Sequence, residues 1–423
     1  MEIFTQVFLA ALLLAMGIQL YLDYRQIRHV RMHRDTVPEA FAERITPELH
    51  RKGADYTTAR TRLSAAENLY GAGLLLIWTL GGGLSWLNGF WQQWELGPLV
   101  TGTGFLVSLF LLFSVLDLPF TLYRTFGIEK RFGFNRSTPG LFLSDRLKQA
   151  LIALALGIPL AALVLWLMDA GRNPVAADYG NEGWWLYVWA VWMGFNLLML
   201  WAFPSIIAPL FNKFTPLEDR ELVQRIESLL ERCGFESKGI FVMDGSRRSS
   251  HGNAYFSGVG NSKRIVFFDT LLETLNGEEI EAVLAHELGH FRRRHVAKRL
   301  GTVALLSLAG LAALGYLMGQ PWFYSGLGLT EPSVHGALAL FLLVAPVFTF
   351  FLQPLMAAVM RRHEFEADDF ASRQADAHHL VRALVKLYRD NASTLTPDPW
   401  HSAYHDSHPP APVRIAHLSA KTG

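Results

Sequence analysis

IFTQVFLAALLLAMGIQLYLDY, residues 3–24, is the first of the apolar stretches that decide the fold of this chain. It is long enough for a helix that crosses a bilayer, which needs about 20 mostly apolar residues. Because it lacks a basic leading segment and a small-residue cleavage site, it predicts a retained transmembrane helix and not a signal peptide. Similar stretches predict further spans over residues 69–90, 99–120, 147–168, 184–205, 300–319 and 335–359.

The composition also favours a membrane protein. Hydrophobic residues make up 51% of the 423 residues and charged residues only 18%, whereas a soluble domain carries about 25% charged residues. The net charge of +1 excludes a globally basic nucleic-acid binder, so we expect no nucleic acid as a partner. Cys233 is the only cysteine, which excludes an intrachain disulfide and leaves histidines and carboxylates to bind any metal.

The loops between the predicted spans alternate in charge. Those after the first, third and fifth spans are rich in Lys and Arg, and so is the start of the C-terminal segment. By contrast, residues 92–98 and 320–334 hold no Lys or Arg, and the fourth loop holds only Arg172. The positive-inside rule therefore predicts that the basic loops and the C-terminus face the cytoplasm and that the N-terminus lies outside.

Two polar regions lie outside the spans, residues 212–299 and 360–423. The first predicts an amphipathic helix over 218–233, stopped at Gly234, and then two short strands over 239–243 and 264–268. We therefore expect a mainly α, polytopic membrane protein with seven transmembrane helices and a small β-sheet. We divide this single structural unit into residues 1–211, 212–299, 300–359 and 360–423.

The string HELGH, residues 286–290, predicts a zinc site. Residues four apart share a helix face, so His286 and His290 can bind one Zn²⁺ while Glu287 holds a water. Asn276 followed by Glu279 predicts a capped start for this helix. The alternative is a pair of histidines packed on a buried helix. His295 is rotated to another face, and we expect it in a loop or at the surface.

A catalytic zinc keeps three protein ligands and an open position, so one ligand must come from elsewhere. Glu364 and Asp368 are four residues apart and share a face, while Glu366 points away. We assign Glu364 as the third ligand and Asp368 as the carboxylate that orients a ligand histidine through its other ring nitrogen. The alternative is a solvated acidic helix face.

Several further strings accompany HELGH, and together they are far more specific than that motif alone. They are DYTTAR (55–60), FGFN (132–135), PLFNKF (209–214), NAYF (253–256), KRIVFFDTLL (263–272), EFEAD (364–368) and SHPP (407–410) followed by Arg414. With these strings the chain resembles the type I CAAX prenyl proteases, the integral-membrane zinc metalloendopeptidases of the a-factor convertase type. The resemblance covers nearly the whole length.

This resemblance implies that seven spans enclose a large water-filled chamber with the zinc near its cytoplasmic end. It also implies that Glu364 is the third ligand, that Asn253 contacts the substrate, and that His408 and Arg414 line the site. We expect an extended peptide to lie along 253–256, including Ala254 and Tyr255, and to add a strand to the sheet. The alternative for that segment is a plain turn with a packed Tyr-Phe pair.

The expected reaction is peptide-bond hydrolysis. Glu287 takes a proton from water and later returns it to the leaving amine. His408 is our candidate donor to the tetrahedral oxyanion. It lies in a His-rich stretch with His401 and His405. The sequence alone predicts a surface loop there, and only the resemblance favours His408.

Three functions fit these features. The first is C-terminal processing of prenylated CAAX peptides, the second is broad quality-control proteolysis of membrane proteins, and the third is a non-catalytic receptor or chaperone. An intact HELGH string with Glu364 argues against the third. We expect one Zn²⁺, a peptide or protein substrate with or without a prenyl group, and the bilayer as partners. A bacterial inner membrane is favoured, with the ER membrane as the alternative.

Overall fold

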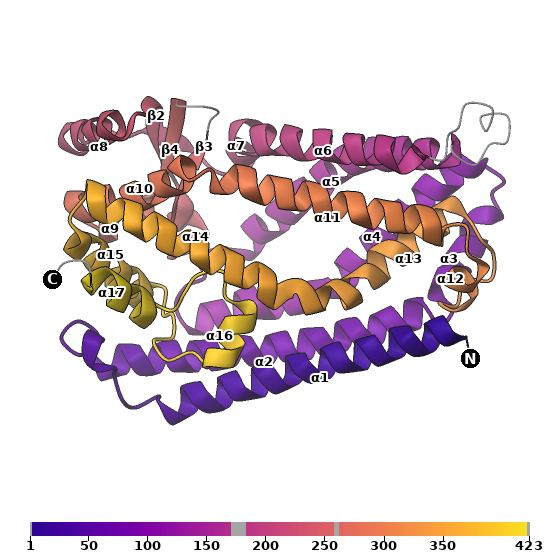
Figure 1. Cartoon of the computed structure of the whole chain (residues 1–423), viewed down its shortest axis with the longest axis horizontal. Coiled ribbons are helices and arrows are strands. Elements are labelled where there is room, and N and C mark those ends of the chain that lie inside the picture. The colour runs from indigo at the N-terminus through magenta and orange to yellow at the C-terminus, as the bar shows by residue number, and fades with distance from the viewer. Residues whose placement is uncertain (1, 171–182, 258–261, 421–423) are drawn as a thin grey trace.

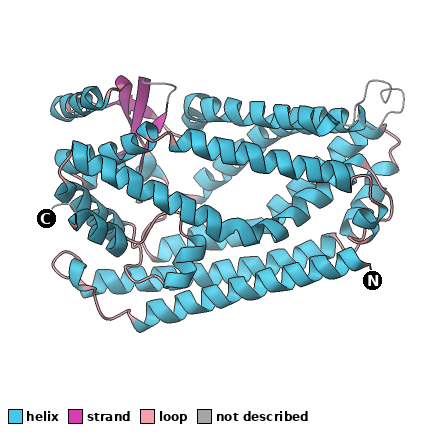
Figure 2. Ribbon diagram, in the orientation of Figure 1, coloured by secondary structure: helices cyan, strands magenta, loops and turns pink. Residues whose placement is uncertain are grey.

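The computed structural model describes residues 2–170, 183–257 and 262–420 as a mainly helical body. Its long helices run side by side along the molecule, and the strands gather with several helices at one end (Figure 1, Figure 2). The N-terminus lies at the opposite end (Figure 1). Arg172, in the fourth predicted loop, lies outside the described residues.

Helices and strands are numbered separately along the chain. The first helices are α1 (Ile3–Met32), α2 (Pro47–Trp78), α3 (Gly83–Gln92), α4 (Pro98–Leu122), α5 (Pro139–Ala170), α6 (Trp184–Ala202), α7 (Ala208–Phe211) and α8 (Arg220–Cys233). The strands are β1 (Phe214–Pro216), β2 (Glu236–Met243), β3 (Ala254–Ser257) and β4 (Ser262–Phe268). The remaining helices are α9 (Asp269–Thr274), α10 (Gly277–Arg292), α11 (His295–Leu317), α12 (Pro321–Ser325), α13 (Val334–Thr349), α14 (Gln353–Gln374), α15 (Ala377–Asp390), α16 (Pro399–His405) and α17 (Ala411–Ser419).

The predicted spans are present, with one difference. Six helical segments of the described residues are long and apolar enough to cross a membrane, and each overlaps a predicted span. The span predicted over 69–90 is a bent pair, because α2 and α3 meet at an angle of 51°. Gly82 has φ 80°, in the left-handed region that only glycine adopts readily, and it separates the two helices. Counting the pair as one span gives the seven that we predicted.

The outer faces of these helices are apolar, as a lipid-facing surface requires. Leu13, Phe110 and Leu151 are exposed on three different spans. The inner faces form a core in which Phe8 and Phe105 are fully buried. A bilayer around the helices would therefore cover the exposed apolar side chains.

The small sheet has the strand order β1-β2-β4-β3. The two predicted strands correspond to β2 and β4, which pair in parallel, and β3 pairs with β4 in antiparallel fashion at one edge. The predicted helix over 218–233 is α8, and Gly234 ends it with φ 76°. A second core packs between α8, the sheet, α10 and α15 around Ile226 and Phe267.

The basic loops and the C-terminal segment meet at the end that carries the sheet. The Tyr56 hydroxyl donates to Glu129 Oε1 at 2.6 Å, and His251 Nε2 lies 3.5 Å from Glu129 Oε2. His251 Nδ1 also lies 2.9 Å from Asn391 Oδ1. These contacts join the first, third and fifth loops to the C-terminal segment. The four polar parts of the chain therefore form one assembly at one end of the helical body.

Gly328 allows a test of how the bend between α2 and α3 is packed. It has φ 80° and lies in the loop before α13. A Cβ there would lie 2.4 Å from the Thr79 carbonyl oxygen, inside the bend. Gly328→Ala should lower the thermal midpoint in detergent, with about 1–2 kcal/mol from the left-handed backbone alone. Gly157→Ala is the control, since a Cβ there meets nothing within 4 Å. Equal midpoints for the two variants would contradict the expected strain.

Candidate active site

The histidine pair lies on α10, whose start is well defined. Asn276 Oδ1 accepts from the Glu279 backbone N–H at 2.9 Å, and the Asn276 N–H donates to Glu279 Oε2 at 2.9 Å. This capping box confirms the predicted helix start. The Glu279 carboxylate also accepts from Lys386 Nζ of α15 at 2.7 Å. The helix end is therefore fixed both locally and against the C-terminal segment.

A close approach between α10 and α14 brings the third candidate ligand opposite the histidines. At Gly289 an added Cβ would lie 3.0 Å from the Ala367 Cα and 3.1 Å from its carbonyl oxygen. A side chain at this position would therefore hold the two backbones apart. Glycine permits the contact, and Glu364, about one turn before Ala367, then faces α10.

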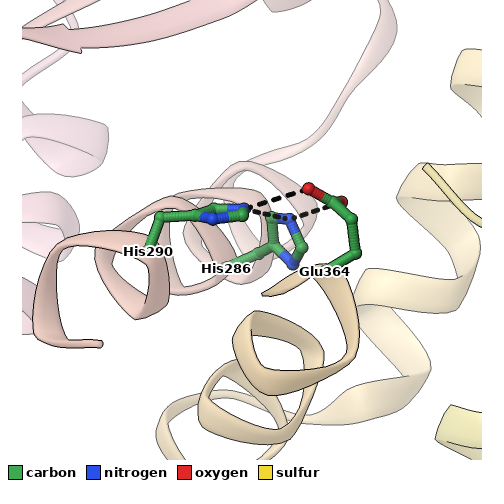
Figure 3. A group of neighbouring side chains, drawn as sticks. All are labelled: His286, His290 and Glu364. Carbon is green, nitrogen blue, oxygen red and sulfur yellow. Dashed lines mark hydrogen bonds and ion pairs between the residues drawn. The ribbon is translucent and has the colours of Figure 1, made fainter. Parts of the chain in front are cut away.

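Three side chains converge at this contact. His286 Nε2 and His290 Nε2 are 3.2 Å apart. Glu364 Oε2 lies 3.4 Å from the former, and Glu364 Oε1 lies 3.3 Å from the latter (Figure 3). Their ligand atoms all lie within 4.8 Å of one another, and no other such group occurs among the described residues. Two ligands about 2.05 Å from a tetrahedral zinc would be about 3.3 Å apart, so the observed spacing fits that ion.

Glu287 lies beside this trio on α10 and is half-buried. Within the described part of the chain, no side chain hydrogen-bonds to its carboxylate. Its neighbours in sequence, His286 and Leu288, are buried. The carboxylate is therefore available to a water molecule, as a general base requires, and that role stays a prediction.

The other ring nitrogen of His286 meets a buried ion pair. His286 Nδ1 lies 2.8 Å from Asp368 Oδ1, and Arg414 donates to both Asp368 oxygens at 2.9 and 2.5 Å. Burial lowers the pKa of His286 and so does the Arg414 charge, but hydrogen bonds to Asp368 and Glu364 outweigh them and raise it to about 9. A cation that binds His286 therefore competes with a proton.

His408 also reaches the trio. Its Nδ1 lies 2.7 Å from Glu364 Oε2, and 63% of its side chain is exposed. Arg414 Nη1 approaches the same oxygen to 3.7 Å. His401 instead lies 3.7 Å from Asp23 of α1. Among the histidines of the predicted stretch, the structure therefore brings His408 to the candidate ligands and directs His401 elsewhere.

A cavity of about 770 Å³ opens beside His408. Its wall includes Gln19 of α1, Arg60 of α2 and Asn391 at the end of α15. It therefore extends from His408 to the inner side of the first two helices. The large chamber that the resemblance implies stays a prediction.

The predicted substrate segment is the edge strand β3, so it is a strand and not a plain turn. Asn253 is exposed just before it, and its side chain accepts from the Ala254 N–H at 2.8 Å. Phe256 packs on Phe291, with ring centroids 5.9 Å apart, next to α10. The Tyr255 hydroxyl is buried without a hydrogen-bond partner among the described residues. The roles of Asn253, Ala254 and Tyr255 stay predictions.

One residue near the trio was misjudged from the sequence. We expected His295 in a loop or at the surface, but it is the first residue of α11 and only 5% exposed. Its Nδ1 lies 2.9 Å from His290 Nδ1. The helical spacing that placed it on another face does not apply, because the chain turns between α10 and α11. No local signal in the sequence indicates that turn.

The chain is similar to known proteins over nearly its whole length. Residues 26–213 match the family described as CAAX prenyl protease N-terminal, five membrane helices, and residues 216–422 match peptidase family M48. The CAAX prenyl protease 1 homolog of Oryza sativa subsp. japonica is 34% identical over 409 residues, covering 94% of this chain and 93% of that protein. CAAX prenyl protease 1 of Saccharomyces cerevisiae is 32% identical, covering 94% and 91%. The crystal structure of S. mikatae Ste24p matches with a TM-score of 0.88 at 31% identity, covering 99% of both chains.

The contact between α10 and α14 gives a second testable expectation. Gly289→Ala should push the two helices apart by a few tenths of an ångström and so separate His290 from Glu364. We expect weaker metal retention, measured as metal content of the purified protein after dialysis against a chelator. Gly301→Ala on α11, where a Cβ meets nothing within 4 Å, should retain metal like the parent chain. Full retention by Gly289→Ala would mean that the close approach does not position the ligands.

Proposed function

Since this chain belongs to peptidase family M48, together with the CAAX prenyl protease 1 homologues, we propose that it is a membrane zinc endopeptidase with His286, His290 and Glu364 as metal ligands. The observation that carries this proposal is the convergence of these three side chains within 4.8 Å. Two imidazoles and one carboxylate are also the ligand set of known zinc peptidases that leave a position open for water.

The nature of the ligands supports zinc as the metal. Imidazole nitrogens suit zinc, whereas magnesium and calcium favour sites built from oxygen ligands. The Asp368 carboxylate contacts Nδ1 of His286, and the Glu366 carboxylate contacts His295. Neither carboxylate therefore adds an oxygen ligand to the trio. A bound Zn²⁺ would supply a Lewis acid that lowers the pKa of water to about 7 and polarises a carbonyl.

The proposed reaction assigns each step to a residue of this chain. Glu287 takes the proton from the attacking water and then delivers it to the leaving amine. His408 lies at the rim of the site and donates a hydrogen bond to the oxyanion. Asp368 holds the His286 ring by its Nδ1 and is itself held by Arg414. These two buried groups therefore position a ligand and do not exchange protons with the substrate.

The edge strand β3 suggests how a peptide is held. An extended peptide can pair with a free sheet edge through main-chain hydrogen bonds. Phe256 of β3 packs against Phe291 of α10, so the edge runs beside the helix that carries the candidate ligands. Asn253 is exposed at the start of the strand, where its amide can reach a peptide main chain.

We propose the C-terminal segment of a prenylated protein as the substrate, in line with the names of the relatives. Broad proteolysis of damaged membrane proteins is the competing function, because it uses the same chemistry. We also propose that the site faces the cytoplasm and that the N-terminus lies outside, since the basic segments assemble at the end that carries the site. A bacterial inner membrane is the proposed location. In a host that makes no prenylated proteins, the natural substrate would be another membrane-associated peptide.

Two substitutions separate metal binding from catalysis. Glu287→Gln should keep the metal and lower kcat by at least about 100-fold, because the general base is lost. His290→Ala should lose the metal, because one of three ligands is gone. Elemental analysis of the purified variants and a peptide-cleavage assay measure the two effects. Normal turnover by Glu287→Gln would refute the assignment of the base, and full metal content in His290→Ala would refute that of the ligand.

Three substrates test the substrate class. Purified protein should cleave a farnesylated peptide that ends in a CAAX sequence, and it should cleave the same peptide without the farnesyl group much more slowly. An unfolded membrane protein offered at the same concentration is the third substrate. Equal cleavage of all three would favour quality-control proteolysis over prenyl-protein processing.

A further inference from the structure

Nδ1 of His290, the ring nitrogen that does not face the trio, is the start of a chain of contacts. His290 Nδ1 lies 2.9 Å from His295 Nδ1, and His295 Nε2 lies 3.2 Å from Glu366 Oε2. We propose that His295 and Glu366 form a relay that orients His290 for metal binding. The proposal rests on the metal site proposed above and adds two positioning residues to it.

Donor and acceptor requirements determine where the protons lie in this chain. His290 Nε2 faces the candidate ligand atoms of the trio, so it must offer a lone pair to a cation. Nδ1 of the neutral His290 ring then carries the proton and donates a hydrogen bond to His295 Nδ1. His295 in turn holds its proton on Nε2 and donates to the Glu366 carboxylate. Each nitrogen of the two rings thus has one role, as a donor or as an acceptor.

The surroundings hold His295 in this position. The ring is 5% exposed and stacks on His363, with centroids 4.1 Å apart and planes 13° apart. Arg294 just before it has φ 56°, a left-handed conformation that is uncommon for a residue with a side chain. This turn between α10 and α11 directs the first side chain of α11 back toward His290. A strained backbone next to a candidate site is consistent with a positional requirement.

With this relay, each of the two proposed histidine ligands is oriented by a carboxylate. His286 meets the carboxylate of Asp368 directly, and His290 reaches the carboxylate of Glu366 through one imidazole. Both carboxylates come from α14, the helix that also supplies Glu364. Outer partners of this kind fix the ring orientation of a metal-binding histidine and make it a better ligand. One helix therefore supplies a ligand and the supports of the other two.

The competing explanation for Glu366 is an ion-pair network at the surface. Its Oε1 lies 3.2 Å from Arg362 Nε, and its Oε2 lies 3.7 Å from Lys298 Nζ. The side chains of these cations are 82% and 52% exposed, and exposed pairs contribute little to stability. Such pairs do not explain why the buried His295 ring lies between the carboxylate and His290. Arg362 therefore offers a matched control, because its loss removes an ion pair and leaves the relay.

The test compares zinc affinities of the full-length protein in detergent, by competition with a chromophoric chelator. His295→Leu and Glu366→Ala should each weaken zinc binding by about 10–100-fold, because each removes a hydrogen-bonding partner in the chain. His295→Gln should recover most of the affinity, since its amide oxygen can accept from His290 and its NH₂ can donate to Glu366. Glu366→Ala should add little once His295 is Leu, because both changes break the same chain. Arg362→Gln should bind zinc like the parent protein.

The outcomes distinguish failure of the relay from failure of the proposed function. Tight zinc binding by the parent chain with equal affinity in His295→Leu would overturn the relay and leave the metal site intact. The relay would also be overturned if His295→Gln bound as weakly as His295→Leu or if Arg362→Gln reproduced Glu366→Ala. Absence of zinc binding by the parent chain itself would overturn both proposals. Thermal unfolding in excess chelator checks the fold of each variant, and if His295→Leu does not fold, unchanged affinity in Glu366→Ala overturns the relay.

Discussion

The candidate site depends on one backbone contact, the close approach of α10 and α14 at Gly289 and Ala367. Each helix alone carries an incomplete set of candidate ligands, two imidazoles on one and a carboxylate on the other. Any side chain larger than hydrogen at Gly289 would have to separate the backbones. Because metal coordination tolerates only small changes in ligand distance, such a separation would be felt directly at the site. The distances between the candidate ligands therefore depend on this backbone contact.

The charges around this contact are largely compensated by partners. Asp368 is fully buried, and its two oxygens accept from Arg414 while it also meets His286. A buried charge without a partner would cost several kcal/mol, so the network permits carboxylates in the interior only because each has a defined donor. The ion pair and hydrogen bonds offset the cost of burial, and they also fix the position of His286, a candidate ligand. On the side of His290, the buried His295 ring likewise lies between two partners, His290 and the partly exposed Glu366.

The membrane helices pack apart from the candidate site and support it through the segments that join them. They form a separate core around Phe8 and Phe105, and the polar segments between them assemble at one end through Tyr56, Glu129 and His251. α14 belongs to both parts, since its helical segment begins with the span at Val334 and continues to Gln374. The position of Glu364 is therefore linked to the packing of the helices in the bilayer, and the site is not an independent soluble domain.

Local patterns in the sequence were sufficient for the spans, the capped start of α10, the two central strands and the shared face of His286 and His290. Each of these depends on residues within about one or two helical turns, or on a continuous apolar stretch, and such short-range physics is readable without a fold. The resemblance to a known family added Arg414 and His408. The bend between α2 and α3 and the return of His295 to His290 were decided only by the tertiary structure. Both depend on how segments distant in the chain pack, and on a backbone turn that no periodicity encodes.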